Sequence, residues 1–151
     1  MSKTYILTRT QWVPQPREAV FDFFCRPSNL QSITPPFLDF KITDAPAEIR
    51  AGSLIRYTLR LHGIPVRWKT EIAAWNPPHS FVDLQISGPY NLWRHTHTFS
   101  EERGGTVIED EVEYALPLGI LGQIAHSILV RRDLKTIFDY RSDKMREMFG
   151  G

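Results

Sequence analysis

Residues 119–150, GILGQIAHSILVRRDLKTIFDYRSDKMREMFG, decide the fold. The stretch has no proline and its apolar residues recur at helical spacing, so it predicts one long helix. A helix of about thirty residues would be about 45 Å long, enough to cross a whole sheet. The apolar positions are Leu121, Ile124, Ile128, Leu134, Ile137, Phe138, Met145 and Phe149. The apolar line changes phase around Arg131 and Arg132.

Upstream of this helix the apolar pattern changes from helical to alternating. Alternation predicts strands, and proline-, glycine- and asparagine-containing breaks mark the turns between them. We expect seven strands, mostly antiparallel because the connections are short. Their ranges are 4–14, 37–43, 53–61, 64–75, 80–87, 91–99 and 106–116. Two short helices, near residues 16–26 and 28–34, separate the first strand from the second.

The order of these elements predicts a single-domain α+β protein spanning residues 1–151. The simplest packing is a curved antiparallel sheet wrapped around the long C-terminal helix. An apolar share of 42% and a charged share of 23% are those of an ordinary globular protein. A strongly curved sheet leaves a gap beside the helix, and such gaps suit small apolar ligands.

Charge and composition argue against several classes of function. A formal net charge of +1 gives no strong field that would attract nucleic acid or an anionic membrane. The first residues lack the apolar centre of a signal peptide, and no stretch approaches the roughly 18 apolar residues of a membrane span. The single cysteine, Cys25, cannot form an intrachain disulfide, which fits a cytoplasmic protein. We expect no cofactor, and the oligomeric state stays open.

The strand NLWRHTHTF carries two histidines on one face. Alternate side chains of a strand share a face, so His95 and His97 lie with Trp93 and Phe99. In the partner strand TVIEDEVEYAL, burying three glutamates together would be costly, so Asp110 takes the inward face. The hairpin then brings Asp110 opposite His95 or His97, or between them. The sequence thus predicts an inward polar cluster in an apolar surround.

The same facing argument assigns the wall that would contact a ligand. On the other strands it turns aromatic and aliphatic side chains inward and lysine, arginine and glutamate outward. The expected ligand-binding residues are Tyr57, Leu59, Trp68, Trp93, His95, His97, Asp110, Val112, Tyr114 and Ile128. Arg131 and Arg132 interrupt the apolar face of the long helix, where they form either a solvated turn or the mouth of the cavity.

Two runs of sequence resemble a known superfamily. Residues 87–122, SGPYNLWRHTHTFSEERGGTVIEDEVEYALPLGILG, are similar to a pattern of one bacterial branch of the START-like SRPBCC superfamily, which includes polyketide cyclase/dehydrase-like proteins. Residues 17–36, REAVFDFFCRPSNLQSITPP, are similar to the first helices of that branch. The resemblance spans nearly the whole chain. It implies a helix-grip fold that binds an apolar molecule between the sheet and the final helix. Members of the branch also occur fused to nucleoside-diphosphate-sugar epimerase-like proteins.

Several interpretations of the cluster remain open, and the first is the one we adopt. In it, His95, His97 and Asp110 are the polar anchors of a site for a small, mainly apolar ligand that is lipid-, polyketide- or quinone-like. In the second, the chain is a cyclase, dehydratase or isomerase in which a histidine, oriented by Asp110, transfers a proton.

Three further interpretations also remain. The two histidines and Asp110 could bind zinc, with His79 and His126 as extra candidates, but we expect no metal. The three side chains could instead only satisfy each other's hydrogen bonds. A protein-interaction module is the remaining class of function.

Overall fold

The computed structural model describes residues 3–151, apart from the side chain of Ser127. Over this range the chain forms one seven-stranded antiparallel sheet in the order β1-β7-β6-β5-β4-β3-β2. The strands are β1 (Thr4–Val13), β2 (Lys41–Asp44), β3 (Leu54–Leu61), β4 (Ile64–Asn76), β5 (Ser80–Ser87), β6 (Leu92–Glu102) and β7 (Gly105–Ala115). The helical segments are α1 (Arg17–Phe24), η1 (Pro27–Ile33), η2 (Pro36–Leu38), α2 (Ile120–Ala125), η3 (His126–Val130) and α3 (Arg131–Phe149).

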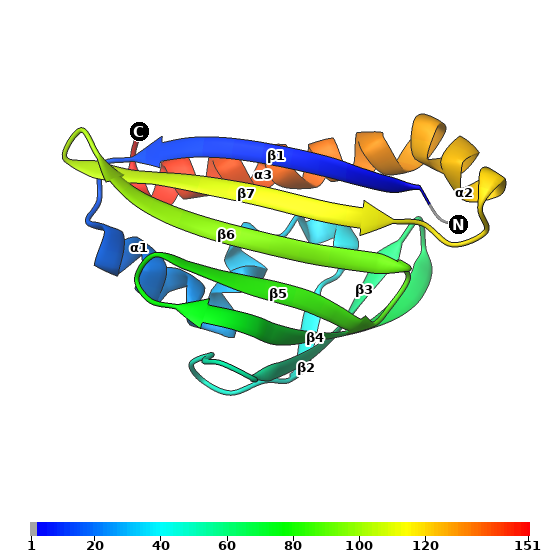
Figure 1. Ribbon diagram of the computed structural model, residues 1–151, viewed down its shortest axis with the longest axis horizontal. Coiled ribbons are helices and arrows are strands. Elements are labelled where there is room, and N and C mark those ends of the chain that lie inside the picture. Colours follow the sequence, from blue (N-terminus) through cyan, green and yellow to red (C-terminus); the bar gives the residue numbers. More distant parts are fainter. Residues whose placement is uncertain (1–2) are drawn as a thin grey trace.

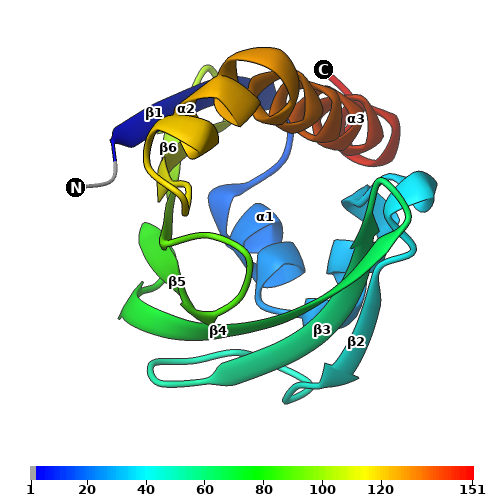
Figure 2. The same cartoon turned by 90° about the vertical axis from the view of Figure 1, so that its right-hand side faces the viewer.

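The sheet curls into a trough, and α3 lies across the open side of that trough (Figure 1 and Figure 2). Helix α1 lies inside the trough, as Figure 2 shows. The predicted helix-grip fold, a curved antiparallel sheet around a long C-terminal helix, is therefore confirmed. None of the helices within residues 3–151 combines the length and the apolar character that crossing a membrane requires.

The second strand begins later than the sequence predicts. The prediction started it at Phe37, whereas β2 begins at Lys41. The preceding residues form the 3₁₀ turn η2, because Pro36 suits the first position of a helical turn. Asp39 then adopts a φ of +48°, in the left-handed region, and redirects the chain into β2.

Strands β6 and β7 form the hairpin that sets the polar cluster in place. Their register puts His97 opposite Asp110. His95 and His97 are 4% exposed and Asp110 is 9% exposed, whereas Glu111 is exposed on the other face. The predicted choice of inward face on these two strands is confirmed.

The long C-terminal helix is continuous but not regular. Between α2 and α3 lies the π-helical turn η3. A π-turn carries an extra residue, so side chains on its two sides are rotated relative to each other. This turn is the physical origin of the phase change seen before Arg131. It also corrects the expected position of Ile128, whose side chain is 70% exposed and points away from the sheet.

The closely packed core beside α1 combines aliphatic side chains with a group of phenylalanine rings. The ring of Phe21 lies 5.9 Å from that of Phe81 and 5.3 Å from that of Phe99, both edge-on. Met145 of α3 is 1% exposed and belongs to the same cluster. This core therefore holds α1, the sheet and α3 together beside the cavity described next.

Candidate functional site

A cavity of about 190 Å³ lies between the concave face of the sheet and α3. Most of its wall is apolar, contributed by β3, β4, β6, α3 and the η1–η2 segment. Its charged or ionisable wall residues, apart from two tyrosines, are Asp83, His95, His97 and Arg141. The four polar residues come from β5, β6 and α3, so three elements meet at one polar patch.

Six of the ten residues expected to contact a ligand line this cavity. They are Tyr57, Leu59, Trp68, Trp93, His95 and His97. The other four lie elsewhere. Asp110 sits behind His95, and Val112 is fully buried against Leu134 and Phe138. Tyr114 is hydrogen-bonded to His126, and Ile128 points outward.

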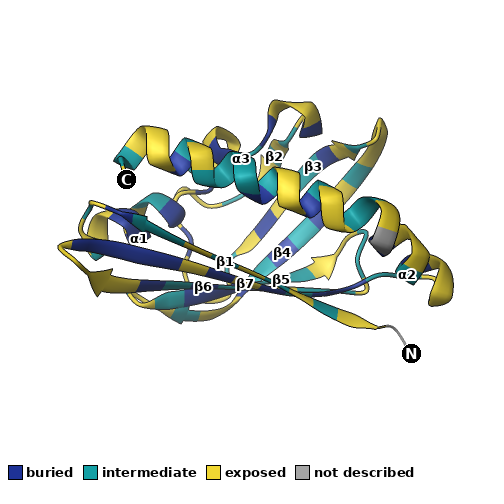
Figure 3. Cartoon of the chain, turned by 90° about the horizontal axis from the view of Figure 1, so that it is seen from above, coloured by how far each residue is buried: buried dark blue, intermediate teal, exposed yellow. Residues whose placement is uncertain are grey.

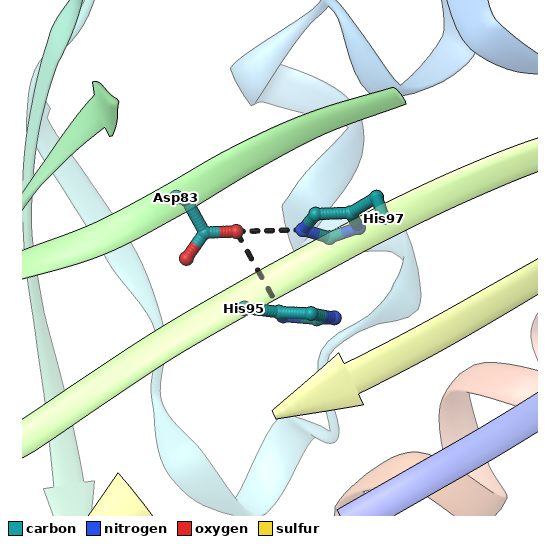
Figure 4. A group of neighbouring side chains, drawn as sticks. All are labelled: Asp83, His95 and His97. Carbon is teal, nitrogen blue, oxygen red and sulfur yellow. Dashed lines mark hydrogen bonds and ion pairs between the residues drawn. The ribbon is translucent and has the colours of Figure 1, made fainter. Parts of the chain in front are cut away.

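The rings of His95 and His97 stack on each other. Their centroids are 3.7 Å apart with an interplanar angle of 23°. Nε2 of His95 lies 2.8 Å from Oδ1 of Asp110, and Nε2 of His97 lies 2.6 Å from Oδ2 of Asp83. Figure 4 shows His97 and His95 reaching toward Asp83 from the neighbouring strand. Each ring is hydrogen-bonded to one carboxylate and lies within ion-pair distance of the other, because Nδ1 of His95 is 3.7 Å from Oδ2 of Asp83 and Nδ1 of His97 is 3.5 Å from Oδ1 of Asp110.

Asp83 is a site residue that the sequence analysis missed. It lies on β5 and pairs with His95 across the sheet. The signal was present in the segment SFVDLQIS, because the alternation that turns Phe81 inward also turns Asp83 inward.

Arg141 is the second missed residue. Its side chain is 14% exposed, and its Nη2 lies 3.5 Å from Oδ1 of Asp110. Its guanidinium carbon lies 5.1 Å from the ring centroid of Phe24 and 5.7 Å from that of Phe138. Arg141 follows Phe138 by three positions and precedes Met145 by four, so helical spacing places it on the apolar stripe. A charged residue on an inward stripe is the signal that could have found it.

Burial and charge fix the protonation of this cluster. Burial and the neighbouring His95 lower the pKa of His97 from 6.5 to about 4, although Asp83 opposes the shift. Burial alone would raise the pKa of Asp83, but the hydrogen bond from His97 and nearby positive charge hold it below its ordinary value. The pKa of Asp110 is likewise held well below its ordinary value, against burial, by Arg141 and the hydrogen bond from His95. At neutral pH both carboxylates are therefore ionised and His97 is neutral.

These protonation states assign the hydrogen bonds. An ionised carboxylate only accepts, so Nε2–H of His97 donates to Asp83 and Nε2–H of His95 donates to Asp110. Nδ1 of the neutral His97 then carries a lone pair and can accept a hydrogen bond.

Three buried polar atoms on residues of the cavity wall have no hydrogen-bond partner among the described residues. They are Nη2 of Arg141, Nε1 of Trp68 and Nδ1 of His97. The first two are donors and the third is an acceptor. Two of them face the same carboxylate, because Nδ1 of His97 and Nη2 of Arg141 each lie 3.5 Å from Oδ1 of Asp110.

The cluster also contains potential metal ligands. One ligand atom from each of Asp83, His95 and His97 lies within 4.8 Å of the others. Two imidazoles and a carboxylate are donors that zinc accepts. Arg141, however, brings a positive charge to the same cluster, which opposes a cation there. Within the described part of the chain, neither His79 nor His126 joins this group of ligands.

Solved structures of other proteins share the fold of this chain. No family model and no curated protein matches the sequence. Protein Ms6760 from Mycobacterium smegmatis is similar in structure, with a TM-score of 0.66 and 20% identity over 95% of this chain and 92% of that chain. The major latex-like protein 151 of Panax ginseng has a TM-score of 0.71 and 12% identity over 97% of each chain. The shared feature is the helix-grip fold.

A third similar structure is larger than this chain. It is the nucleoside-diphosphate sugar epimerase from Corynebacterium glutamicum, with a TM-score of 0.69 and 25% identity. The match covers 93% of this chain and 28% of the epimerase chain. The present fold therefore corresponds to one part of that protein.

Proposed function

We propose that this protein binds a small, mainly apolar molecule in the cavity between the sheet and α3. The observation that carries the proposal is a cavity of about 190 Å³ whose mainly apolar wall carries one patch of ionisable side chains, Asp83, His95, His97 and Arg141. Specific small-molecule sites combine such a wall with a few well-placed polar groups. His97, Arg141 and Trp68 would hold the ligand's polar group or groups, and Asp83 and Asp110 would orient the two histidines. The resemblance to ligand-binding SRPBCC proteins agrees with this proposal.

The size of the cavity favours a compact ligand. An engineered apolar cavity of about 150 Å³ in another protein binds benzene. A cavity of about 190 Å³ therefore suits a molecule of one or two rings better than a long acyl chain. Among the ligand types considered from the sequence, a ring compound such as a small polyketide- or quinone-like molecule fits best.

The charge of the cluster favours a neutral polar group on that ligand. Two carboxylates, Asp83 and Asp110, belong to this cluster, so a ligand carboxylate would be repelled by them as well as attracted by Arg141. A hydroxyl or carbonyl oxygen can instead accept from Nη2 of Arg141 or Nε1 of Trp68 without adding charge. A hydroxyl can also donate to Nδ1 of His97.

The protonation of His97 supports binding over proton transfer. A general base works best when its pKa lies near the operating pH. The pKa of His97 is about 4, so at neutral pH this histidine accepts a hydrogen bond well but removes a proton poorly. We therefore prefer a binding protein to a cyclase, dehydratase or isomerase in which His97 is the general base.

Isothermal titration calorimetry with a naphthol and the corresponding naphthoate tests this proposal. The two probes share a ring system and differ in charge, so the naphthol should bind at least about tenfold more tightly. Arg141→Met should weaken naphthol binding, whereas Arg94→Gln on the opposite face of β6 should not. Native mass spectrometry of protein purified from its own host would then show the natural cargo. Equal binding of the two probes would contradict the neutral-ligand proposal, and no binding of either would contradict the site itself.

A further inference from the structure

The start of the C-terminal helix exposes a group of large aliphatic side chains. We call this group the α2 patch, and it consists of Leu118, Ile120, Leu121, Ile124 and Ile128. Their exposed fractions are 75%, 74%, 66%, 52% and 70%, respectively. Figure 3 shows α2 mostly in the colour of exposed residues, in contrast to the inward side of α3. Contiguous apolar surface of this kind on a soluble fold marks an interaction site.

The patch is not the packing face of the helix. Gly122 and His126 occupy that face, and both are buried. A Cβ on residue 122 would lie 2.2 Å from the carbonyl oxygen of Pro117, so the helix approaches the preceding loop as closely as a glycine allows. Nε2 of His126 lies 2.7 Å from the hydroxyl oxygen of Tyr114, which fixes the rotation of this turn. The aliphatic side chains are therefore held outward by contacts on the opposite side.

Two arginines follow the patch directly, and the aspartate after them, Asp133, is paired with His62 at 2.7 Å. From residue 114 to residue 132 the sequence has no aspartate or glutamate. The only charged residues in this span are Arg131 and Arg132, which are exposed and follow the patch directly. Lys3 lies over the ring of Tyr5, which in turn stacks on His126, so a third cation lies near the same end. An aliphatic ridge flanked by cations is the pattern of a helix that lies in a membrane interface.

We propose that the α2 patch docks onto the surface of an anionic lipid bilayer. The five aliphatic side chains enter the boundary between headgroups and acyl chains, and Arg131 and Arg132 contact lipid phosphates. A second copy of the chain fits the patch less well, because a two-fold interface would bring both pairs of arginines together. The patch also lacks the aromatic residues that are enriched at protein interfaces.

Docking in this way requires no occupied cavity, so the inference stands apart from the proposed ligand. Docking through the α2 patch would bring the cavity close to the bilayer. Leu134, Ile137 and Phe138 line the cavity and lie on the turns of α3 that follow the patch. A docked helix would hold this wall close to the bilayer, where apolar molecules concentrate.

Vesicle sedimentation of the full chain tests the docking. The probes are phosphatidylcholine vesicles with and without phosphatidylglycerol, and size-exclusion chromatography with light scattering reports the oligomeric state. Binding should be stronger to the anionic vesicles. Ile120→Ser/Ile124→Ser should lower partitioning to both kinds of vesicle by about tenfold or more. Arg131→Gln/Arg132→Gln should lower it about tenfold on anionic vesicles only.

Ile86→Ser is the matched control, because Ile86 is 48% exposed on β5, away from α2. This variant should sediment like the unmodified protein, and all variants concern exposed side chains that leave the core intact. The proposal is overturned if anionic vesicles bind no protein, or if the isoleucine variant binds them as the unmodified protein does. It is equally overturned if the protein forms a dimer that Ile120→Ser/Ile124→Ser separates, because the patch is then a contact between copies.

Discussion

Nε2 of His97 lies 2.6 Å from Oδ2 of Asp83, and this bond joins β6 to β5 at the wall of the cavity. The ring stacks on His95 on one side and on Phe81, at 4.2 Å, on the other. A neutral ring held this way has one fixed tautomer, with its Nδ1 lying 3.5 Å from Oδ1 of Asp110. The predictions below follow from this arrangement and its neighbours.

The stability of the protein should fall as the pH drops from about 6.5 to about 4. In this range the unfolded chain protonates residue 97 and the folded chain does not, because the folded pKa is lowered from 6.5 to about 4. The unfolded state then binds more protons, so acidification favours unfolding by up to about 3 kcal/mol. Urea unfolding at a series of pH values measures this slope. His97→Gln should flatten it, whereas replacing the exposed His79 by glutamine should not.

Below about pH 4 a second loss of stability should follow. The pKa values of Asp83 and Asp110 are lower in the folded protein than in the unfolded chain, so ionisation of both carboxylates stabilises the fold at neutral pH. That contribution disappears as pH falls through the folded pKa values. Asp83→Asn should therefore lower stability at pH 7 by about 1–3 kcal/mol and have a smaller effect at pH 2. An equal loss at both pH values would show that packing, and not charge, is what Asp83 contributes.

Removing Arg141 should leave the two carboxylates uncompensated. Arg141→Met should lower the free energy of unfolding by about 2 kcal/mol at pH 7 and raise the pKa of Asp110. Carbon-detected NMR of the Asp110 carboxyl measures that pKa directly. Asp110→Asn added to Arg141→Met should recover part of the loss, since it removes the unpaired charge. A loss that the second substitution deepens would contradict the assigned pairing.

Gly122 should not tolerate a side chain. Because a Cβ would lie 2.2 Å from the carbonyl oxygen of Pro117, Gly122→Ala should destabilise the protein by about 2–3 kcal/mol, despite the better helix propensity of alanine. Ala125→Ser, at an exposed position of the same helix, should change stability by less than about 0.5 kcal/mol. Thermal unfolding compares the two. A stabilised Gly122→Ala variant would mean that propensity, not close approach, governs this turn.

Local periodicity was enough to predict the elements and their packing. The alternation of the strands and the helical spacing after Gly119 predict the seven strands, the final helix and the curved sheet that grips it. The alternation also predicts the inward side of β6 and β7. Three glutamates of β7 share one face, and that face must be exposed to solvent, so Asp110 lies on the inward face. These features depend on residues that are close in the sequence, so the spacing of apolar residues is enough to predict them.

What the patterns miss depends on distant or irregular geometry. The π-turn at η3 appears in the sequence only as a change of phase in the apolar spacing, which does not say which side of the turn faces outward, so the exposure of Ile128 was not predicted. Pairing across the sheet gives Asp83 its role, and contact from α3 gives Arg141 its role. Both residues lay on faces that a fuller use of periodicity would have turned inward. Only some of the expected residues line the cavity, because side-chain packing decides which of them reach it. A sequence pattern does not specify that packing.

The indole signals of the protein test the central claim most directly. Trp68 and Trp93 line the cavity, whereas Nε1–H of Trp12 donates to the backbone carbonyl of Glu102 at the surface. Titration of a naphthol into ¹⁵N-labelled protein should move the indole resonances of Trp68 and Trp93, and most of all that of Trp68, whose Nε1–H gains an acceptor. The Trp12 signal should stay in place. Unmoved Trp68 and Trp93 signals at saturating probe, or an equal shift of Trp12, would contradict binding in this cavity.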